Sequence, residues 1–557
     1  MSGAKIGEII AFVVYFTLVI AIGLFFFIRD RKFGGEKNFF LGGRRMNGFV
    51  AALSAGASDM SAWVLMGLPG SIFAAGLGQV WISIGLLIGT VLAWLLVAPR
   101  LRRYSILAQD SITIPQFLTK RFLSKNPALQ VVCAVIFVIV YCVYGASSIN
   151  ACGTLFDTLF GLDPRIGMTI ATVIIIAYVF LGGFKAVCWT DFLQGMLMLL
   201  ALMITPIVAA AFLTKTGPIG NVVDPENFYN MLATGKFDWI SVATILTGLG
   251  WGLGYFGMPH IIVRYISIGS EKEMKKSRWI GIGWTTLILL MATVVGIVAH
   301  MYLGDKVQNT STVFIELARY VMPVFIGGII ISAILAASMS TADSQLLAAS
   351  SAFASDVYKT SIKKDASDKQ VLWVGRIVVV IISLVAFAIA MLGSGEKPIV
   401  KAFSTIMSLV SAAWAAFGAS IGPVIMLALY WRKFNFKGAI AGIVTGFVVD
   451  ILWMFLFNYE YYGGVSAIFN TNLYEIIPGF ICGMAASIIT SLATGGASKE
   501  VTDLFDKVIS AKSVEQSDAE IVVVTKSGET ITIPMDEQVQ DVEVEAPVEE
   551  IIDTTAE

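Results

Sequence analysis

The chain has 557 residues, of which 57% are hydrophobic and only 14% charged, and its mean hydropathy is +0.81. A soluble globular domain carries roughly 25% charged residues, so the composition excludes an ordinary soluble protein and predicts a membrane protein. The net charge of −1 gives no sign of nucleic-acid binding, and the five cysteines show neither metal-ligand spacing nor a secreted disulfide pattern.

Apolar runs recur along the chain, and each is long enough to cross the roughly 30 Å of bilayer hydrocarbon as a helix. The first run lacks a basic leader and is too long for a signal-peptide core, so we interpret it as a retained helix. We predict an all-α polytopic membrane protein with thirteen transmembrane helices. They lie near residues 7–28, 51–73, 78–98, 130–158, 166–184, 190–213, 239–259, 279–303, 322–353, 372–392, 402–430, 438–458 and 473–493.

The distribution of Lys and Arg tests this number, because cytoplasmic connections are enriched in both. The connections before the even-numbered spans carry 25 of them, whereas the N-terminus and the other connections carry 8. The alternation predicts a multi-pass protein of the plasma membrane, with its N-terminus outside and its C-terminus in the cytoplasm.

The composition changes after the last span. From Thr494 to the end there are 4 Lys and no Arg against 16 Asp and Glu. We therefore divide the chain into a transmembrane domain, residues 1–495, and an acidic cytoplasmic tail, residues 496–557. The tail is expected to be partly disordered, with a short hairpin whose turn lies at residues 525–529. A solvated appendage and a regulatory or docking element both remain open.

The second span is interrupted by polar residues. It places Ser58, Asp59 and Ser61 at membrane depth. A membrane helix satisfies its own backbone, so an interruption must be buried or must line a polar cavity. An ionisable group at this depth is costly and usually functional, which makes Asp59 a candidate functional residue.

The seventh span has five glycines and one proline between Gly248 and Pro259, which makes a poor continuous helix. Broken helices at corresponding positions of two repeats mark the binding sites of transporters. Since spans 2 and 7 are five apart, spans 2–6 and 7–11 are predicted to form two inverted five-helix repeats. The alternative is that the glycines only permit close helix packing. The aromatic residues Trp63, Tyr144, Trp251 and Tyr255 could likewise be core or interface residues.

The ninth span carries four oxygen-bearing side chains within five residues: Ser340, Thr341, Asp343 and Ser344. Hydroxyls inside a bilayer usually bond to carbonyls of the preceding turn. Together, however, these side chains offer the hard oxygen ligands that small cations prefer. A span that donates side-chain oxygens and a broken span that donates freed carbonyls would form a sodium cage.

At these residues the chain resembles the sodium/solute symporter family, and within it the bacterial sodium/proline symporters. The resemblance covers roughly residues 7–495 and leaves out the tail. The motifs that carry it are Ser58-Asp59-Met60-Ser61 with Trp63, residues 65–70, Gly182-Gly183-Phe184 with Trp189-Thr190-Asp191, residues 250–257, Pro259-His260-Ile261, residues 332–337, Ser340-Thr341, residues 373–376 and residues 474–480.

The resemblance implies thirteen helices, a LeuT-like core of two inverted repeats, and import of L-proline driven by the sodium gradient through alternating access. Asp59 would support the sodium site electrostatically. The implied sodium ligands are the carbonyls of Ala57, Met60 and Ala337 and the hydroxyls of Ser340 and Thr341. A candidate second sodium site in some relatives corresponds to Asp191, Asp343 and Ser344.

The resemblance places proline beside the sodium ion. The implied substrate-binding residues are Ser61, Trp63, Tyr144, Trp251 and Tyr255. Ala62 stands where proline symporters commonly have glycine, which bears on the fit of the substrate.

The expected partners are the solute and the lipid bilayer, and the expected cofactor is Na⁺ as coupling ion, without an organic cofactor. The sequence has no P-loop and no His-Glu-x-x-His motif, so neither favours ATP hydrolysis or metal-dependent proteolysis, and we expect no enzymatic activity. Two alternatives remain open. The cargo could be another small amino acid or a carboxylate, or the chain could be a transporter-like nutrient sensor that signals through its acidic tail.

Overall fold

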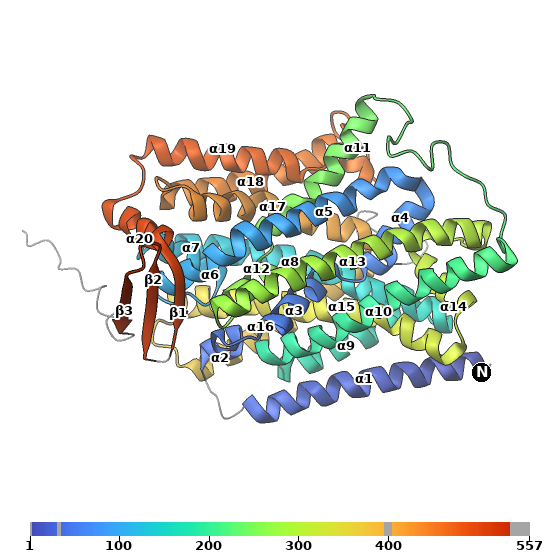
Figure 1. The fold of residues 1–557 in the computed structure, drawn as a ribbon, viewed down its shortest axis with the longest axis horizontal. Coiled ribbons are helices and arrows are strands. Elements are labelled where there is room, and N and C mark those ends of the chain that lie inside the picture. Colours follow the sequence, from blue (N-terminus) through green and yellow to red (C-terminus); the bar gives the residue numbers. More distant parts are fainter. Residues whose placement is uncertain (1–2, 31–34, 182, 395–403, 518, 535–557) are drawn as a thin grey trace, which may run out of the picture.

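The structure is a computed structural model that describes residues 3–30, 35–181, 183–394, 404–517 and 519–534. Motif residue Gly182, the start of the predicted eleventh span and the tail after Pro534 lie outside this part. Long helices run side by side along the longest axis of the molecule (Figure 1). We call the end that carries α20 and the strands the sheet end, and the opposite end the far end.

The first half of the chain forms α1 Gly3–Asp30, α2 Glu36–Leu41, α3 Gly48–Met60, α4 Leu68–Ala75, α5 Val80–Leu92, α6 Ala98–Leu107, α7 Ile114–Arg121, α8 Ala128–Phe160, α9 Pro164–Leu181 and α10 Phe184–Thr216. The second half forms α11 Trp239–Gly250, α12 Pro259–Ser267, α13 Glu271–Leu303, α14 Val313–Val321, α15 Val324–Ser351, α16 Asp368–Leu392, α17 Ile406–Tyr430, α18 Phe436–Phe457, α19 Ile476–Ala493 and α20 Lys499–Ser510. The strands are β1 Ala511–Gln516, β2 Glu520–Thr525 and β3 Thr530–Pro534.

The predicted polytopic α-helical architecture is confirmed, because eleven helices in the described part are long and apolar enough to cross a membrane. The number thirteen stays a prediction, and two places account for the difference. Residues Trp63–Leu107 form one helical stretch of 45 residues, and the predicted fifth span contributes only a shorter apolar helix, Pro164–Ala177.

Polar residues fix where several of these helices begin. The Asn47 side chain accepts a hydrogen bond from the Phe49 N–H at 2.8 Å, and Asp238 does the same for Ser241 at 2.9 Å. Ser367 forms a reciprocal capping box with Gln370 at the start of α16. Each cap satisfies an N–H group that has no partner within the first helical turn. Polar residues between the apolar runs therefore determine where these helices begin.

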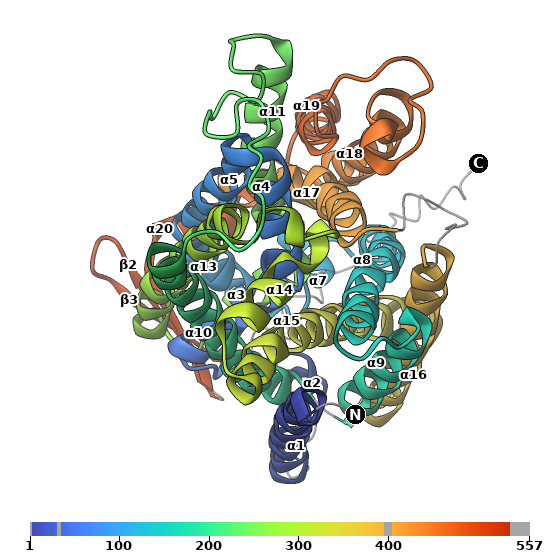
Figure 2. The same ribbon diagram turned by 90° about the vertical axis from the view of Figure 1, so that its right-hand side faces the viewer.

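Helices α3 and α15 lie in the interior of the bundle, with α1, α9, α16, α18 and α19 around it (Figure 2). Helix α15 is buried along nearly its whole length. Helix α1 packs closely on it, since a Cβ added to Gly328 would meet the Ala11 methyl at 2.9 Å. The other side of α1 exposes Ile10, Val14 and Leu18, as expected for a face covered by lipid. Polar residues on α3 and α15 are therefore held away from lipid.

The first part of the acidic tail is folded rather than solvated. Strands β2 and β3 pair antiparallel, with Ile521 opposite Ile533, in the segment for which the sequence predicts a hairpin. Strand β1, which the sequence did not predict, adds to β2 in the order β1-β2-β3. The buried Arg102 of α6 donates to the Val514 carbonyl at 2.8 Å and pairs with Glu515 at 3.2 Å. The tail is thus docked on the helix ends of the transmembrane domain.

Candidate functional site

The predicted break in the second span lies at Ser61. Helix α3 ends at Met60, and Ser61 has φ 45° and ψ −175°, a left-handed backbone conformation that side chains rarely adopt. The chain resumes as the π-helical segment η2, Trp63–Gly67, and then as α4. The Ser61 hydroxyl accepts the Trp63 N–H at 3.0 Å, which satisfies part of the second half-helix. The carbonyls of the last turn of α3 lose their helical N–H partners, so they need other partners, such as side-chain donors or a ligand.

The break in the seventh span is spread over more residues. Helix α11 passes into the 3₁₀ segment η5, Trp251–Phe256, and Met258 is extended before α12 begins at Pro259. A Cβ on Gly252 would lie 2.3 Å from the Gly85 carbonyl oxygen, and one on Gly254 would lie 2.1 Å from the Trp414 indole nitrogen. The glycines therefore do permit close packing, as the alternative held, and the same packing brings the break against α5 and α17.

The two breaks face one buried cavity. Its lining contains all five predicted substrate-binding residues together with Asp59 and Met60, and the complete set is Asp59, Met60, Ser61, Trp63, Leu86, Tyr144, Trp251, Tyr255, Val410 and Trp414. The Trp63 and Trp251 rings stack across it, with centroids 5.4 Å apart and planes at 23°. The chemistry of this lining is aromatic, with a single carboxylate.

Asp59 is buried, with 7% of its surface exposed. Its Oδ2 accepts a hydrogen bond from the Tyr255 hydroxyl at 2.5 Å, which joins the first break to the second. Within the described part of the chain, no Lys, Arg or His side chain forms an ion pair with it. A buried carboxylate without a cation is unfavourable, so this position favours binding of a positive charge.

Oxygen atoms gather where α15 crosses the end of α3. The Ser340 hydroxyl lies 2.9 Å from the Ala57 carbonyl oxygen and 3.2 Å from that of Ala337. The neighbouring Thr341 hydroxyl is fully buried and has no hydrogen-bond partner among the residues that the structure describes. Three of the five predicted sodium ligands, Ala57, Ala337 and Ser340, therefore lie together as hard oxygen donors. Thr341 follows Ser340 on α15, and Met60 ends α3. This donor set fits a small monovalent cation.

The candidate second sodium site has a different content. Asp191 and Ser344 both lie within hydrogen-bond reach of the Arg264 guanidinium, with Nη2 3.1 Å from Asp191 Oδ2. Ser344 also contacts Asp343 Oδ1 at 3.1 Å. All four side chains are essentially buried. The predicted seventh span ends at residue 259, so the sequence placed Arg264 in a connection, whereas it lies inside the bundle on α12.

A vestibule leads from the far end toward the aromatic cavity. It is lined by residues of α5, α11 and the segment between α18 and α19, and Trp251 belongs both to it and to the cavity. Tyr474 stacks on Trp251 with centroids 5.2 Å apart. Sequence analysis did not predict Trp414, Leu86 or Val410 for this site. They come from spans with no local interruption, so no sequence signal marked them.

The sheet end is closed by an ion network. Arg44 donates from Nε to Asp110 Oδ1 at 2.8 Å and from Nη1 to the Ile266 carbonyl at 3.0 Å, and Lys37 also pairs with Asp110. Burial alone would raise the pKa of Asp110, but the charges of Arg44 and Lys37 hold this pKa below its ordinary value. The connection after α6 is thereby tied to the segment before α3 and to α12.

The fold and the site define a polytopic membrane protein in which two interrupted helices face one central cavity, the organisation of a solute transporter. A sequence model of the Sodium:solute symporter family matches residues 39–446, and the chain belongs to this family. The resemblance seen in the motifs is therefore confirmed.

Three relatives illustrate this membership. The high-affinity proline transporter PutP of Bacillus subtilis (strain 168) is 40% identical over 497 residues, which cover 88% of this chain and 98% of that protein. The osmoregulated proline transporter OpuE of the same strain is 38% identical over 500 residues, covering 89% and 97%. A sodium/proline symporter of Staphylococcus aureus (strain JH9) is 39% identical over 489 residues, covering 86% and 91%. All three are transporters, so the expectation of a transporter rather than an enzyme is confirmed.

A solved structure shares the fold. It is a Na⁺-coupled sialic acid symporter in a substrate-bound outward-open state, which matches 88% of this chain and 99% of its own with a TM-score of 0.70. Its sequence identity to this chain is 19%.

Proposed function

We propose that this protein is a sodium-coupled secondary transporter that imports L-proline by alternating access. The observation that carries the proposal is the buried cavity between the two breaks, in which five aromatic and hydroxyl side chains surround an uncompensated carboxylate. The names of the relatives, two proline transporters and a sodium/proline symporter, support the cargo.

Sodium would bind where α15 meets the end of α3. The carbonyls of Ala57, Met60 and Ala337 and the hydroxyls of Ser340 and Thr341 would hold it, and the negative charge of Asp59 would stabilise it from nearby. The unpartnered Thr341 hydroxyl supports this assignment, because a fully buried hydroxyl is rarely left without a partner unless a ligand supplies one.

Proline would occupy the aromatic cavity beside that position. Its pyrrolidine ring would pack against Trp63 and Trp251, which requires these two stacked rings to separate, and its secondary ammonium can rest against aromatic π faces. Its carboxylate can use N–H groups exposed at the break after Met60. Ala62 adds a methyl group beside this pocket, so it bears on which small amino acid fits there.

The coupling would arise because both ligands act on the same break. Sodium holds the end of α3 against α15, and that ordering completes the pocket that Ser61 and Trp63 line. Each ligand then raises the affinity of the other by the same factor. Proline uptake into proteoliposomes with and without an inward sodium gradient tests this. Uptake that does not depend on the gradient would refute sodium coupling. Sodium-dependent uptake of another small amino acid or a carboxylate, without uptake of proline, would refute only the cargo.

The proposed topology has thirteen spans, with spans 2–6 and 7–11 as inverted repeats, the N-terminus outside and the sheet end in the cytoplasm. Gly76 supports it, because its φ of +76° makes a turn between α4 and α5 within the long stretch Trp63–Leu107. Single cysteines placed at Gln79 and Lys526, labelled from outside intact cells with a membrane-impermeant reagent, test the orientation. Labelling at residue 526 and not at residue 79 would reverse it.

A nutrient sensor is the second candidate, and the docked tail is the observation that favours it. Arg103 joins the tail to Glu271 at the start of α13, donating to the Ala511 carbonyl at 3.3 Å and to Glu271 Oε1 at 2.7 Å. A change in the transporter core could therefore reach the tail. Deleting residues 496–557 distinguishes the two functions. Full uptake without the tail supports a transporter, whereas lost cellular signalling with intact uptake supports a sensor role in addition.

A further inference from the structure

Helix α13 carries three lysines on its outer surface at the sheet end. The helix has 33 residues, so it is longer than the roughly 30 Å of bilayer hydrocarbon, which about 20 helical residues cross. The predicted span begins at residue 279, and Lys272, Lys275 and Lys276 lie in the two turns before it. All three are exposed. They therefore lie just outside the predicted span, at the level of the lipid headgroups.

The same face of α13 continues into the span and becomes apolar. Trp279 is 68% exposed, and farther along the helix Leu287 and Leu290 are 41% and 52% exposed. With 3.6 residues per turn, these three positions and the three lysines fall within about one third of the helix circumference. We call this face, formed by residues 272, 275, 276, 279, 283, 287 and 290, the α13 stripe. It changes in order from lysines to an indole and then to aliphatic side chains.

Gly283 makes a notch in the α13 stripe. It lies one turn after Trp279 and one turn before Leu287, and it is exposed. A Cβ added at this position would meet no side chain of the described residues within 4 Å. The apolar part of the stripe therefore has an open space between two larger side chains.

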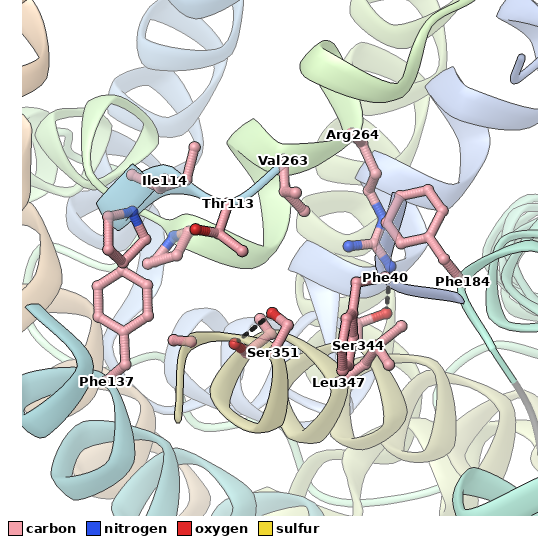
Figure 3. A pocket seen from close by; sticks show the side chains of 14 residues that line it. Phe40, Thr113, Ile114, Phe137, Phe184, Val263, Arg264, Ser344, Leu347 and Ser351 are labelled. Atoms are coloured by element: carbon pink, nitrogen blue, oxygen red, sulfur yellow. Dashed lines mark hydrogen bonds between the residues drawn. The ribbon is translucent and has the colours of Figure 1, made fainter. Parts of the chain in front are cut away.

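Other cations near the start of α13 are satisfied within the protein. Arg103 pairs with Glu271 at 2.7 Å. Arg264, on the preceding helix α12, is directed inward and donates to the Ser344 hydroxyl (Figure 3). These arginines serve the packing of the bundle and are not available to a ligand on its surface.

The lysines of the α13 stripe differ from these arginines. Lys276 lies 3.9 Å from Glu273, with 47% and 26% of the two side chains exposed, and solvent makes such a pair weak. Across the described ranges, no carboxylate forms an ion pair with Lys272 or Lys275. The start of the stripe thus carries positive charge that the protein itself does not offset.

We propose that the α13 stripe binds an anionic phospholipid of the leaflet at the sheet end. The phosphodiester lies against Lys272, Lys275 and Lys276, and Trp279 marks the border between headgroup and hydrocarbon, where tryptophan is enriched. One acyl chain lies in the notch at Gly283. Lysine clusters next to a membrane span attract anionic lipids. A phospholipid is favoured over a free phosphate because the charged and apolar parts form one continuous face.

The start of α13 is also tied to the second predicted span. The Ser277 hydroxyl donates to the Gly48 carbonyl at 2.8 Å, and the Glu273 carboxylate accepts the Gly48 N–H. Gly48 is the first residue of α3. A lipid bound to α13 therefore stabilises two helices that are joined at this end, which makes thermal stability a suitable measure of binding.

Thermal unfolding of the purified full-length protein in detergent tests the proposal, with phosphatidylglycerol or phosphatidylcholine of identical acyl chains added. Phosphatidylglycerol should bind at least about tenfold more tightly, because each lysine near an anionic lipid contributes roughly fivefold in affinity. Replacement of Lys272, Lys275 and Lys276 by Gln should abolish this preference, and replacement by Arg should keep it. A wild type that does not distinguish the two lipids would overturn the proposal.

A matched control lies before α16. Lys363, Lys364 and Lys369 precede Trp373, which is 47% exposed, but two aspartates lie among these lysines. Their replacement by Gln removes the same charge as the triple substitution on α13 and should leave the preference for phosphatidylglycerol unchanged. An equal loss of preference in both triple variants would show a general effect of charge and would overturn the assignment to α13.

Two further measurements separate a phospholipid from a free phosphate. Glycerol 3-phosphate, which carries the charge without acyl chains, should not stabilise the protein. Gly283→Phe, which fills the notch without a change of charge, should weaken phosphatidylglycerol binding several-fold. Equal stabilisation by glycerol 3-phosphate, or unchanged affinity in Gly283→Phe, would overturn the proposal. Neither measurement uses sodium or proline, so its failure is distinct from a failure of the proposed transport function.

Discussion

Asp59 and Asp191 are both buried carboxylates inside one bundle, yet their surroundings are opposite. Asp59 has a single tyrosine hydroxyl as its hydrogen-bond donor, at 2.5 Å, and no ion-pair partner in the described part of the chain. Asp191 accepts hydrogen bonds from Ser54 and Arg264 and forms an ion pair with the latter. The first lies beside a cavity, and the second lies within a closed network.

Asp59 is therefore a carboxylate that a bound cation would stabilise, whereas Asp191 is already stabilised by the guanidinium of Arg264. A buried charge without a partner destabilises the protein until a ligand offsets it, so the surroundings of Asp59 make ligand binding favourable. A carboxylate paired with a built-in guanidinium gains nothing comparable from a free ion. Burial alone therefore does not identify a ligand-binding carboxylate in this protein. The distinguishing feature is that no Lys, Arg or His side chain in the described part of the chain pairs with it.

The largest expected contrast comes from exchanging each carboxylate for an amide. Asp59→Asn should reduce proline uptake by about a hundredfold or more, in line with loss of an essential charge, and should not lower the thermal stability of the sodium-free protein. Asp191→Asn should instead destabilise the fold by about 3–5 kcal/mol, because it leaves Arg264 buried and unpaired. Uptake assays and thermal unfolding in detergent measure the two effects. Equal losses of stability in both variants would remove the distinction.

Two hydroxyls of the proposed sodium site allow a test of whether a cation binds near Asp59. Ser340→Ala and Thr341→Ala each remove one donor from the proposed sodium position, and each should raise the sodium concentration for half-maximal uptake by about tenfold, the value of one lost polar contact of 1.4 kcal/mol. Ser338→Ala is the matched control on the same helix, because its hydroxyl bonds back to the Ile334 carbonyl. A similar rise in the control would argue against a sodium role for the other two.

Asp110 extends the comparison to a paired carboxylate near the surface. Its pKa is held below the ordinary value by Arg44 and Lys37 despite partial burial, so its stabilising effect is present above about pH 4 and is lost as the pH falls through the lowered value. Asp110→Asn should therefore unfold at a lower temperature than the wild type at pH 7. The gap should shrink in acid, and a gap that is constant from pH 7 to below pH 4 would contradict the ion-pair explanation.

Glu515 is the most exposed of the paired carboxylates compared here, with 44% of its side chain accessible to solvent. Its substitution should therefore have the smallest effect on stability. Glu515→Gln weakens the contact of β1 with Arg102 and should change the stability by less than about 1 kcal/mol, because solvent screens such pairs. Limited proteolysis of the tail is the sensitive measurement. Glu529→Gln, in the connection between β2 and β3, serves as the control. Equal cleavage of the two variants would show that the Glu515 pair does not hold the tail.

Much of the site follows from local sequence. The polar interruption at Ser58–Ser61 and the glycines from Gly248 onward marked the two breaks, because a backbone at membrane depth must either be helical or be satisfied by something else. The aromatic residues next to the breaks were predicted for the same reason, and the structure brings them to one cavity. Trp414 was not predicted, since its helix has no interruption, and its place against Gly254 depends on how α17 packs.

The sequence by itself determined a polytopic membrane protein, the location of both broken helices and the oxygen-rich turn of α15, because each depends on composition within a few residues. Only the tertiary structure decided which carboxylate has a partner. Asp59 and Asp191 look alike along the chain, and their difference comes from Arg264, which is 73 residues from Asp191 and 205 from Asp59 in the numbering but contacts only the former. Charge compensation in a low-dielectric interior acts over a few ångströms, so it is settled by packing and not by sequence distance.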